Sequence, residues 1–219
     1  MSQSTLFLVL NATLETIYMV LLSGLIAIII GLPLGITLYI SRKGNILQHS
    51  LVHQSLAIIV NITRSIPFII LMIAIIPFTR FVVGSAIGTT AAIVPLSICA
   101  MPFIGRIVEN ALIEIPKGLI EAAVAMGATP KQIILKVLIP EALPSIINGL
   151  TLTIVSLIGY SAMAGAVGGG GLGDVSVRYG YQRFDVNIML ITIAIMVILV
   201  QAIQYIGDRT AKWVAHGRH

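Results

Sequence analysis

Uncharged, apolar stretches of the chain alternate with shorter stretches that carry the charged residues. Four uncharged stretches are long enough to cross a membrane, which takes about 20 apolar residues. They contain 26, 25, 32 and 22 residues and cover positions 16–41, 81–105, 142–173 and 186–207. The third is longer than one span requires, so we expect its helix to end at the glycine run 168–171.

A fifth span is expected around Arg64, although its start is weakly marked. The 15 residues between Arg64 and Arg80 are uncharged, which is too short for a complete crossing. The apolar segment 57–62, on the other side of Arg64, supplies the missing length. The pattern therefore predicts an all-α integral membrane protein with five transmembrane helices.

Lysine and arginine residues fall mostly on one side of these spans. Nine lie in one set of alternate loops, at positions 42, 43, 106, 117, 131, 136, 209, 212 and 218. Three lie in the other set, at positions 80, 178 and 183, and Arg64 is assigned to neither. Cytoplasmic loops carry the excess of cations, so we expect the N-terminus outside and the C-terminus inside.

This orientation divides the chain into three parts. Residues 1–11 are expected to form an extracytoplasmic tail, 12–209 the membrane domain, and 210–219 a cytoplasmic tail. Residues 1–13 contain no cationic region, and no small-residue cleavage site follows them. We therefore expect no removable signal peptide.

Composition agrees with a membrane protein. Hydrophobic residues make up 58% of the chain, charged residues 10%, and the mean hydropathy is +1.05. A soluble domain carries roughly 25% charged residues, and a disordered chain is far less hydrophobic. The single cysteine, Cys99, excludes an internal disulfide and a cysteine-based metal site.

Residues that could carry chemistry are scarce in the predicted spans. No Asp, Glu or His is expected at mid-membrane, so the chain has no evident proton relay. The glycine run 168–171 lacks a lysine for phosphate binding and is expected outside, away from cytoplasmic ATP. We find no nucleophile–base pair and no metal-ligand cluster, and assign no catalytic residue, metal or cofactor to the chain. Active transport would then need energy from a partner.

The longest hydrophilic stretch, 106–141, is predicted to be structured. Ile120, Ala123 and Val124 form one apolar stripe on a short helix over 119–126, and Gly127 is placed to end it in a left-handed conformation. Thr129, Pro130 and Gln132 then have the spacing of a capping box that starts a second helix. We expect Pro140 to end this second helix.

Two short helices at an angle could serve three purposes. A helix-turn-helix for DNA is disfavoured, because the four cations of 106–141 are balanced by four acids and phosphate binding needs an excess of cations. We therefore expect no nucleic-acid partner. A structure that docks on another protein and an ordered loop that packs on its own chain both remain open.

The same stretch resembles a known motif. It is similar to the EAA loop of ATP-binding-cassette (ABC) importer permeases, and the matching residues are Glu121-Ala122-Ala123, Gly127 and Val137-Leu138-Ile139-Pro140. Val137 and Ile139 stand where that pattern prefers Ile and Leu. The resemblance implies the type I permease fold. It also implies that the loop is a coupling helix docked on a cytoplasmic ATPase, which binds ATP and Mg²⁺. Glu121 would be a polar contact or cap, Ala122 and Ala123 the close-packed surface, and Gly127 the turn.

Three further segments make the resemblance more specific. One is Arg64-Ser65-Ile66-Pro67-Phe68, which is similar to a segment of amino-acid permeases. The other two, residues 110–116 and residues 159–173, resemble permeases of methionine importers. The resemblance implies a homodimer in the bacterial inner membrane with two ATPase subunits. It also implies an extracytoplasmic substrate-binding lipoprotein and L- and D-methionine as substrates.

Apart from the resemblance, the residues of the fourth span give only weak information about which solute is transported. Tyr160, Ser161 and Met163 lie near the outer end of the fourth span, where a solute could be met, and a Met side chain could contact a thioether. Core packing of Met163 and a hydrogen bond from Ser161 to its own helix backbone are the more common roles of such residues. Arg64 could anchor at the cytoplasmic interface or line the pathway.

Three charged residues near the outer surface are candidates for contact with the binding protein. They are Asp174, Arg178 and Arg183. Solvated loop charges are the alternative for all three. For the whole chain the alternatives are an ABC permease for another small solute, a self-contained channel or secondary carrier, and a structural membrane scaffold.

Overall fold

The computed structural model describes residues 3–216, and all regular secondary structure in that range is helical. The first half contains α1 (Gln3–Ser41), α2 (Ser50–Ser65), α3 (Phe68–Ala74), α4 (Ile76–Val83) and α5 (Thr89–Ile113). The second half contains α6 (Lys117–Ala125), α7 (Pro130–Ile133), η1 (Ile134–Leu138), α8 (Ile139–Ala164), η2 (Gly165–Gly169), α9 (Gly171–Val175), η3 (Ser176–Tyr181) and α10 (Val186–His216).

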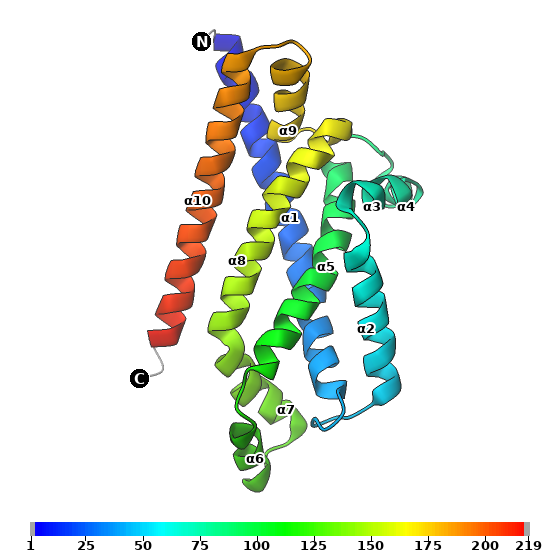
Figure 1. Cartoon of the computed structure of the whole chain (residues 1–219), viewed down its shortest axis with the longest axis vertical. Coiled ribbons are helices and arrows are strands. Elements are labelled where there is room, and N and C mark those ends of the chain that lie inside the picture. The colour runs from blue at the N-terminus through cyan, green and yellow to red at the C-terminus, as the bar shows by residue number, and fades with distance from the viewer. Residues whose placement is uncertain (1–2, 217–219) are drawn as a thin grey trace.

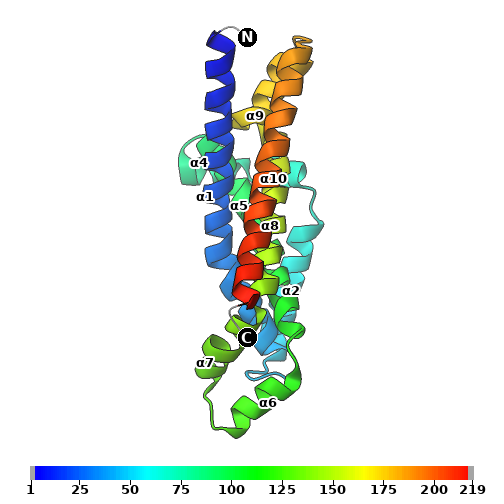
Figure 2. The ribbon, with the colours of Figure 1, turned by 90° about the vertical axis from the view of Figure 1, so that its left-hand side faces the viewer.

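The long helices lie side by side along one axis (Figures 1 and 2). Four continuous helical segments are long and apolar enough to cross a membrane, and the bent pair α2 and α3 raises the number to five. The N-terminal end of α1 and the C-terminal end of α10 lie at opposite ends of the bundle (Figure 1). Termini at opposite ends agree with an odd number of crossings. The predicted all-α architecture is confirmed.

Exposed apolar side chains show where the bundle meets lipid. On α10 the exposed set includes Leu190, Ile193, Val197 and Ile198. The indole of Trp213 is 80% exposed near the last turn of α10, at the level where aromatic side chains favour the membrane–water interface. Membrane lipid is therefore a partner of this surface.

The second span differs from its prediction. We expected it to combine 57–62 with the uncharged segment after Arg64, but the helix that runs along the bundle is α2, which ends at Ser65. The chain then turns by 103° into α3, and α3 and α4 extend sideways (Figure 1). The cause is Pro67, which has no N–H and forces Ile66 into an extended conformation with ψ 123°.

The third span is displaced along the sequence. It was predicted over 81–105, but α5 begins at Thr89 and continues to Ile113. Gly84 and Gly88 adopt φ values of +81° and +102°, which separates α4 from α5. The loop predicted from Arg106 therefore starts later, because Arg106 and Glu109 lie inside the last turns of α5 and form an ion pair.

Parts of both predicted tails are helical, because hydropathy does not mark where a helix ends. Helix α1 begins at Gln3, and α10 continues to His216. Met1, Ser2, Gly217, Arg218 and His219, which belong to the predicted tails, lie outside the described residues.

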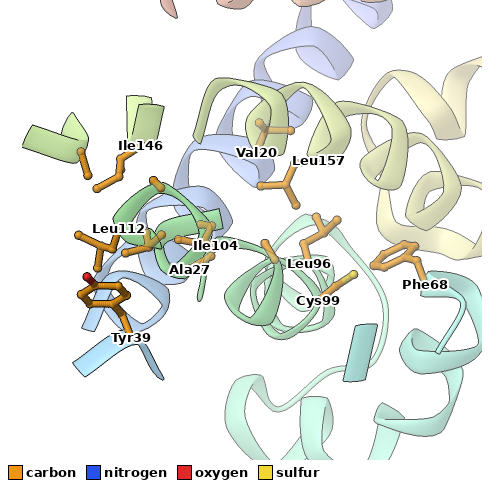
Figure 3. Close-up of a cluster of buried hydrophobic side chains, with 14 of the residues drawn as sticks. Val20, Ala27, Tyr39, Phe68, Leu96, Cys99, Ile104, Leu112, Ile146 and Leu157 are labelled. Carbon is orange, nitrogen blue, oxygen red and sulfur yellow. The ribbon is translucent and has the colours of Figure 1, made fainter. Parts of the chain in front are cut away.

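The most extensive contact between two helices joins α1 and α5. A Cβ atom on Gly31 would lie 2.7 Å from Cβ of Ile104, and one on Gly35 would overlap the Gly105 carbonyl oxygen and lie 2.5 Å from Cβ of Val108. Glycines let these backbones approach, as in other membrane helix pairs. The main core cluster surrounds this crossing and includes Ala27, Leu96, Cys99, Ile104 and Leu157 (Figure 3).

Candidate coupling knob and translocation face

The hydrophilic stretch folds into a protrusion at the end of the bundle opposite the N-terminus (Figures 1 and 2). We call this protrusion, α6 through η1 (residues 117–138), the knob. Helix α6 ends in a Schellman motif, in which Ala128 N donates to Ala123 O at 3.0 Å and Gly127 N to Val124 O at 2.9 Å. Gly127 has φ +78°, and a Cβ atom added to it would meet no other atom within 4 Å. The turn therefore requires glycine for its backbone conformation and not for space.

The start of the second helix is confirmed as a capping box. Thr129 N donates to Gln132 Oε1 at 2.8 Å, and Gln132 N donates to Thr129 Oγ1 at 3.4 Å. Pro130 occupies the first turn, where its missing N–H has no intrahelical partner to lose.

The predicted stop at Pro140 is wrong. Helix α7 passes through the π-helical segment η1 into α8, and Pro130–Gly169 forms one continuous helical stretch of 40 residues. A π-helical turn changes the hydrogen-bond register, which accommodates a residue without an N–H. The second half of the knob, α7 and η1, is therefore continuous with the helix of the fourth span.

The inner side of the knob packs on its own chain. Ala123 is 3% exposed and belongs to the same core cluster as Ile133, Leu138 and Leu112. The cluster thus runs without interruption from the bundle into the knob. Ala123 was expected to form a close-packed surface for a partner, but in the structure its side chain is buried within its own chain.

The outer side of the knob carries the available surface. Glu121, Ala122 and Gly127 are exposed, together with the apolar side chains of Val124 and Met126. Met126 is 81% exposed and Val124 56%. The sequence pattern did not single out Met126, and its position directly before the helix-ending glycine was the available signal.

The last three motif residues lie at the junction of knob and span. Val137 and Ile139 are half-buried, and Pro140 is exposed at the start of α8. The side chain of Ser145 on α8 donates to Glu114 Oε2 at 3.3 Å, just beyond the end of α5. This bond therefore joins the start of α8, which follows the knob, to the end of α5, which precedes it.

The three candidate pathway residues have different surroundings. Tyr160 stacks on Phe68 with 5.0 Å between ring centroids and lines a cavity between α5 and α8 of about 180 Å³. Ser161 is 2% exposed and donates to the Ile158 carbonyl at 2.7 Å, so it is bonded to its own helix. Met163 is 48% exposed, without a place in that cavity lining.

The cavity has a mixed lining. Ala100, Phe103, Ile107, Leu152 and Leu157 supply its apolar surface, and Thr153, Ser156 and Tyr160 its hydroxyl groups. Arg64 lies beside it, with its guanidinium carbon 5.0 Å from the Phe103 ring centroid. We call this cavity and Arg64 the translocation face.

The charged residues predicted on the outer side gather at one place. Arg178 forms an ion pair with Asp174, and this hydrogen bond raises the pKa of the Arg178 guanidinium. The Arg183 guanidinium lies 4.5 Å from the Tyr179 ring centroid. Tyr181 and Phe184, 69% and 84% exposed, follow in the same outer loop and were not predicted from the sequence.

The glycine-rich segment is held by the first helix. Glu15 Oε2 accepts from Gly171 N at 2.7 Å, and Thr16 Oγ1 accepts from Leu172 N at 2.8 Å. These two amides start α9 and have no partner inside their own helix. Glycine is required because a Cβ on Gly170 would lie 3.0 Å from the Glu15 carboxylate.

Replacing Glu15 with alanine is expected to loosen the glycine-rich segment, since one charge-assisted hydrogen bond to a backbone amide disappears. The expected loss is about 1–3 kcal/mol, with faster amide exchange at 168–173. Hydrogen exchange on the purified protein measures the effect. Glu15→Gln, which keeps an acceptor oxygen, should retain part of the protection. Equal protection in Glu15→Ala and the native chain would contradict the role of this carboxylate.

A buried carboxylate lies near the cytoplasmic end of α5. Glu109 is 2% exposed and accepts from Arg106 Nη1 at 2.6 Å. The other Arg106 nitrogen, Nη2, donates to Asn61 Oδ1 on α2 at 2.6 Å. This network lets two charged side chains remain inside a membrane helix.

Within residues 3–216, no group of three or more His, Cys, Asp or Glu side chains is arranged to hold a metal ion.

The chain matches known transport proteins over most of its length. The family model described as binding-protein-dependent transport system inner membrane component covers residues 27–216. A probable D-methionine transport system permease protein of Vibrio cholerae is 54% identical over 209 residues, which is 95% of this chain and 93% of that protein. The D-methionine transport system permease protein of Escherichia coli K12 is 54% identical over 165 residues, 75% of this chain and 76% of the relative.

Solved structures agree with the sequence comparison. A chain of the MetNI methionine ABC transporter, solved in inward-facing conformations, is 51% identical with a TM-score of 0.96, covering 98% of this chain and 99% of that one. A chain of an amino acid ABC transporter with histidines is 17% identical with a TM-score of 0.77 over 94% of this chain and 93% of that one, and shares the fold. With a family match over residues 27–216 and these similarities, the chain belongs to the inner-membrane components of binding-protein-dependent transport systems and is a multi-pass permease.

Proposed function

We propose that this permease carries methionine, in its L- and D-forms, across the inner membrane as a homodimer driven by two partner ATPase subunits. An extracytoplasmic binding lipoprotein would deliver the substrate, and ATP and Mg²⁺ would be bound by the ATPase. The knob is the observation that supports this most strongly, because it is exposed on its outer side and continuous with a membrane span on the other. The permease relatives named for D-methionine support the substrate.

The knob would act as a lever. Force applied to α6 passes through the packed cluster around Ala123 and Ile133 into η1 and α8. The bond between Ser145 and Glu114 moves the end of α5 with it. Because α5 and α8 line the cavity, displacement of the knob would open or close the translocation face as a rigid-body motion.

Each coupling residue has a physical task in this proposal. Glu121 and Ala122 would contact the ATPase, with Met126 filling an apolar pocket on it. Ala123 and Gly127 hold the shape of the knob, through burial and through the left-handed turn. Val137, Ile139 and Pro140 form the junction that transmits force to α8.

The outer loop would receive the binding protein. Asp174, Arg178 and Arg183 offer charges of both signs, and Tyr181 and Phe184 add exposed aromatic surface. Arginine and aromatic residues are enriched where proteins bind one another.

Transport by the assembled system is the direct test. The permease would be reconstituted in vesicles with its ATPase and binding lipoprotein, and uptake of labelled L- and D-methionine followed with and without ATP. ATP-dependent uptake of both is expected. Uptake by the permease alone would favour a self-contained carrier. ATP-driven uptake of a different solute, but not of methionine, would show that the proposed substrate is wrong.

Gly127→Asp is expected to leave the permease inserted and folded but to reduce transport-coupled ATPase activity by about tenfold. The new residue must adopt φ +78°, which strains its backbone, and it places a carboxylate on the docking surface. ATP hydrolysis in reconstituted vesicles with loaded binding protein measures the coupling.

Gly118→Asp is the matched control, because Gly118 lies in the same knob, has open space around it and does not have a left-handed φ. This variant adds the same charge without the strain and should keep most of the coupling. Equal losses in both variants would show that charge, and not the turn, matters.

A further inference from the structure

The Arg64 guanidinium lies beside the middle of α5 and not at either end of that helix. Its guanidinium stacks on Phe103, which is 14 residues after Thr89 and 10 before Ile113, the two ends of α5. At 1.5 Å per residue these intervals correspond to about 21 Å and about 15 Å. An ionised side chain placed against the middle of a membrane helix is costly and usually serves a function.

The charge of Arg64 is not neutralised by the acids that balance other arginines in the described residues. The ion pairs found in residues 3–216 join Arg106 to Glu109 and Arg178 to Asp174. The ring of Phe103 is the contact found for the Arg64 guanidinium in that range, and Arg64 itself is exposed. A cation–π contact leaves the donors in the plane of the guanidinium available.

The neighbouring cavity fits a small amphipathic solute. Its volume of about 180 Å³ is below the range of about 300–1,000 Å³ typical of drug-sized ligands. Phe103 belongs to the lining and also carries Arg64, so the apolar cavity and the cation share one wall. Ser156 and Tyr160 on the opposite wall offer hydroxyl groups.

We propose that Arg64 binds the carboxylate of a zwitterionic amino acid during its passage, while the solute's apolar side chain occupies the cavity between α5 and α8. The inference rests on the proposed function, which it deepens by naming the pathway group that recognises the substrate. A guanidinium can hold a carboxylate through two parallel hydrogen bonds, and this pairing is strong where water is scarce. The solute's carboxylate would pair with Arg64, and because the solute carries no net charge its passage would leave the total charge beside α5 unchanged.

Arg64→Gln and Arg64→Lys in the complete reconstituted transporter test this role. Arg64→Gln should lower methionine uptake about ten- to a hundredfold, the value of one charge-assisted pair, and leave binding-protein-stimulated ATPase activity within about twofold. Arg64→Lys keeps the charge without the bidentate geometry, so its methionine uptake should lie between that of Arg64→Gln and that of the native protein. Arg80→Gln removes a cation from the exposed face of α4 and serves as the control with near-native uptake.

Binding to the transporter in lipid nanodiscs, without the binding protein, tests the carboxylate directly. Labelled methionine should be displaced by its hydroxy-acid analogue, which keeps the carboxylate, but not by methioninol, which lacks it. Arg64→Gln should abolish this difference.

Several outcomes would overturn the proposal. One is uptake by Arg64→Gln within about twofold of the native protein. Another is a parallel loss of assembly, ATPase activity and uptake, which indicates a structural role. Displacement by methioninol as effective as by methionine is a third. A native transporter without ATP-driven methionine uptake would instead overturn the proposed function, and this inference with it.

Discussion

Gly35→Ala is expected to destabilise the permease by about 1–3 kcal/mol or more, as insertion of a methyl group into a packed interior does. The added Cβ would overlap the Gly105 carbonyl oxygen, which cannot rotate away, and lie 2.5 Å from Cβ of Val108. The α1–α5 crossing would have to widen, and with it the centre of the core cluster. Thermal unfolding of the purified protein, followed by loss of monodispersity, measures the effect.

Gly24→Ala provides a matched comparison on the same helix. A Cβ on Gly24 would lie 3.7 Å from Leu157 Cδ1 and 3.9 Å from Ile154 Cγ1, which are ordinary packing distances. This variant should be neutral or slightly stabilising, because alanine favours a helix over glycine. Similar midpoints for Gly24→Ala and Gly35→Ala would show that the crossing is not held by close approach.

Glu109→Ala is expected to cost about 3–5 kcal/mol, because it leaves Arg106 partly buried without its carboxylate. The Arg106 side chain is 22% exposed and that of Glu109 3%, so water compensates little. Asn61 would remain as a neutral partner. Unfolding in mixed micelles by increasing denaturing detergent measures the loss.

Two further variants separate the missing charge from lost packing. The double substitution Arg106→Met with Glu109→Leu removes both charges and should recover most of the stability, since apolar residues can replace a buried pair. Asp174→Ala breaks the pair with Arg178, whose side chain is 57% exposed, and should cost about 0–1 kcal/mol. A double variant as unstable as Glu109→Ala would contradict the ion-pair explanation.

The knob was the part of the candidate site that local sequence signals predicted best. Gly127, Thr129 and Gln132 act within one or two turns of their own backbone, so their spacing suffices to predict the turn and the cap. Pro140 shows the limit of such signals. Its effect on the helix depends on the π-helical register of η1, which no local pattern marks.

Pathway residues were harder to predict, because each has the same local pattern as a core residue. Tyr160 and Ser161 are adjacent in sequence, yet one lines the cavity and the other bonds its own helix. The sequence left Arg64 as either an interfacial anchor or a pathway residue, and the structure sets its guanidinium against Phe103.

The sequence by itself determined the all-helical membrane class, the charge asymmetry that predicts orientation, and the turn chemistry of the knob. These properties depend on apolar length, on charge between spans and on backbone preferences, all of which act locally. Tertiary structure alone decided which charges are compensated and which face of each helix is buried. Arg106 finds Asn61 across 45 positions and Glu15 finds Gly171 across 156, and contacts between such distant residues exist only once the helices have packed.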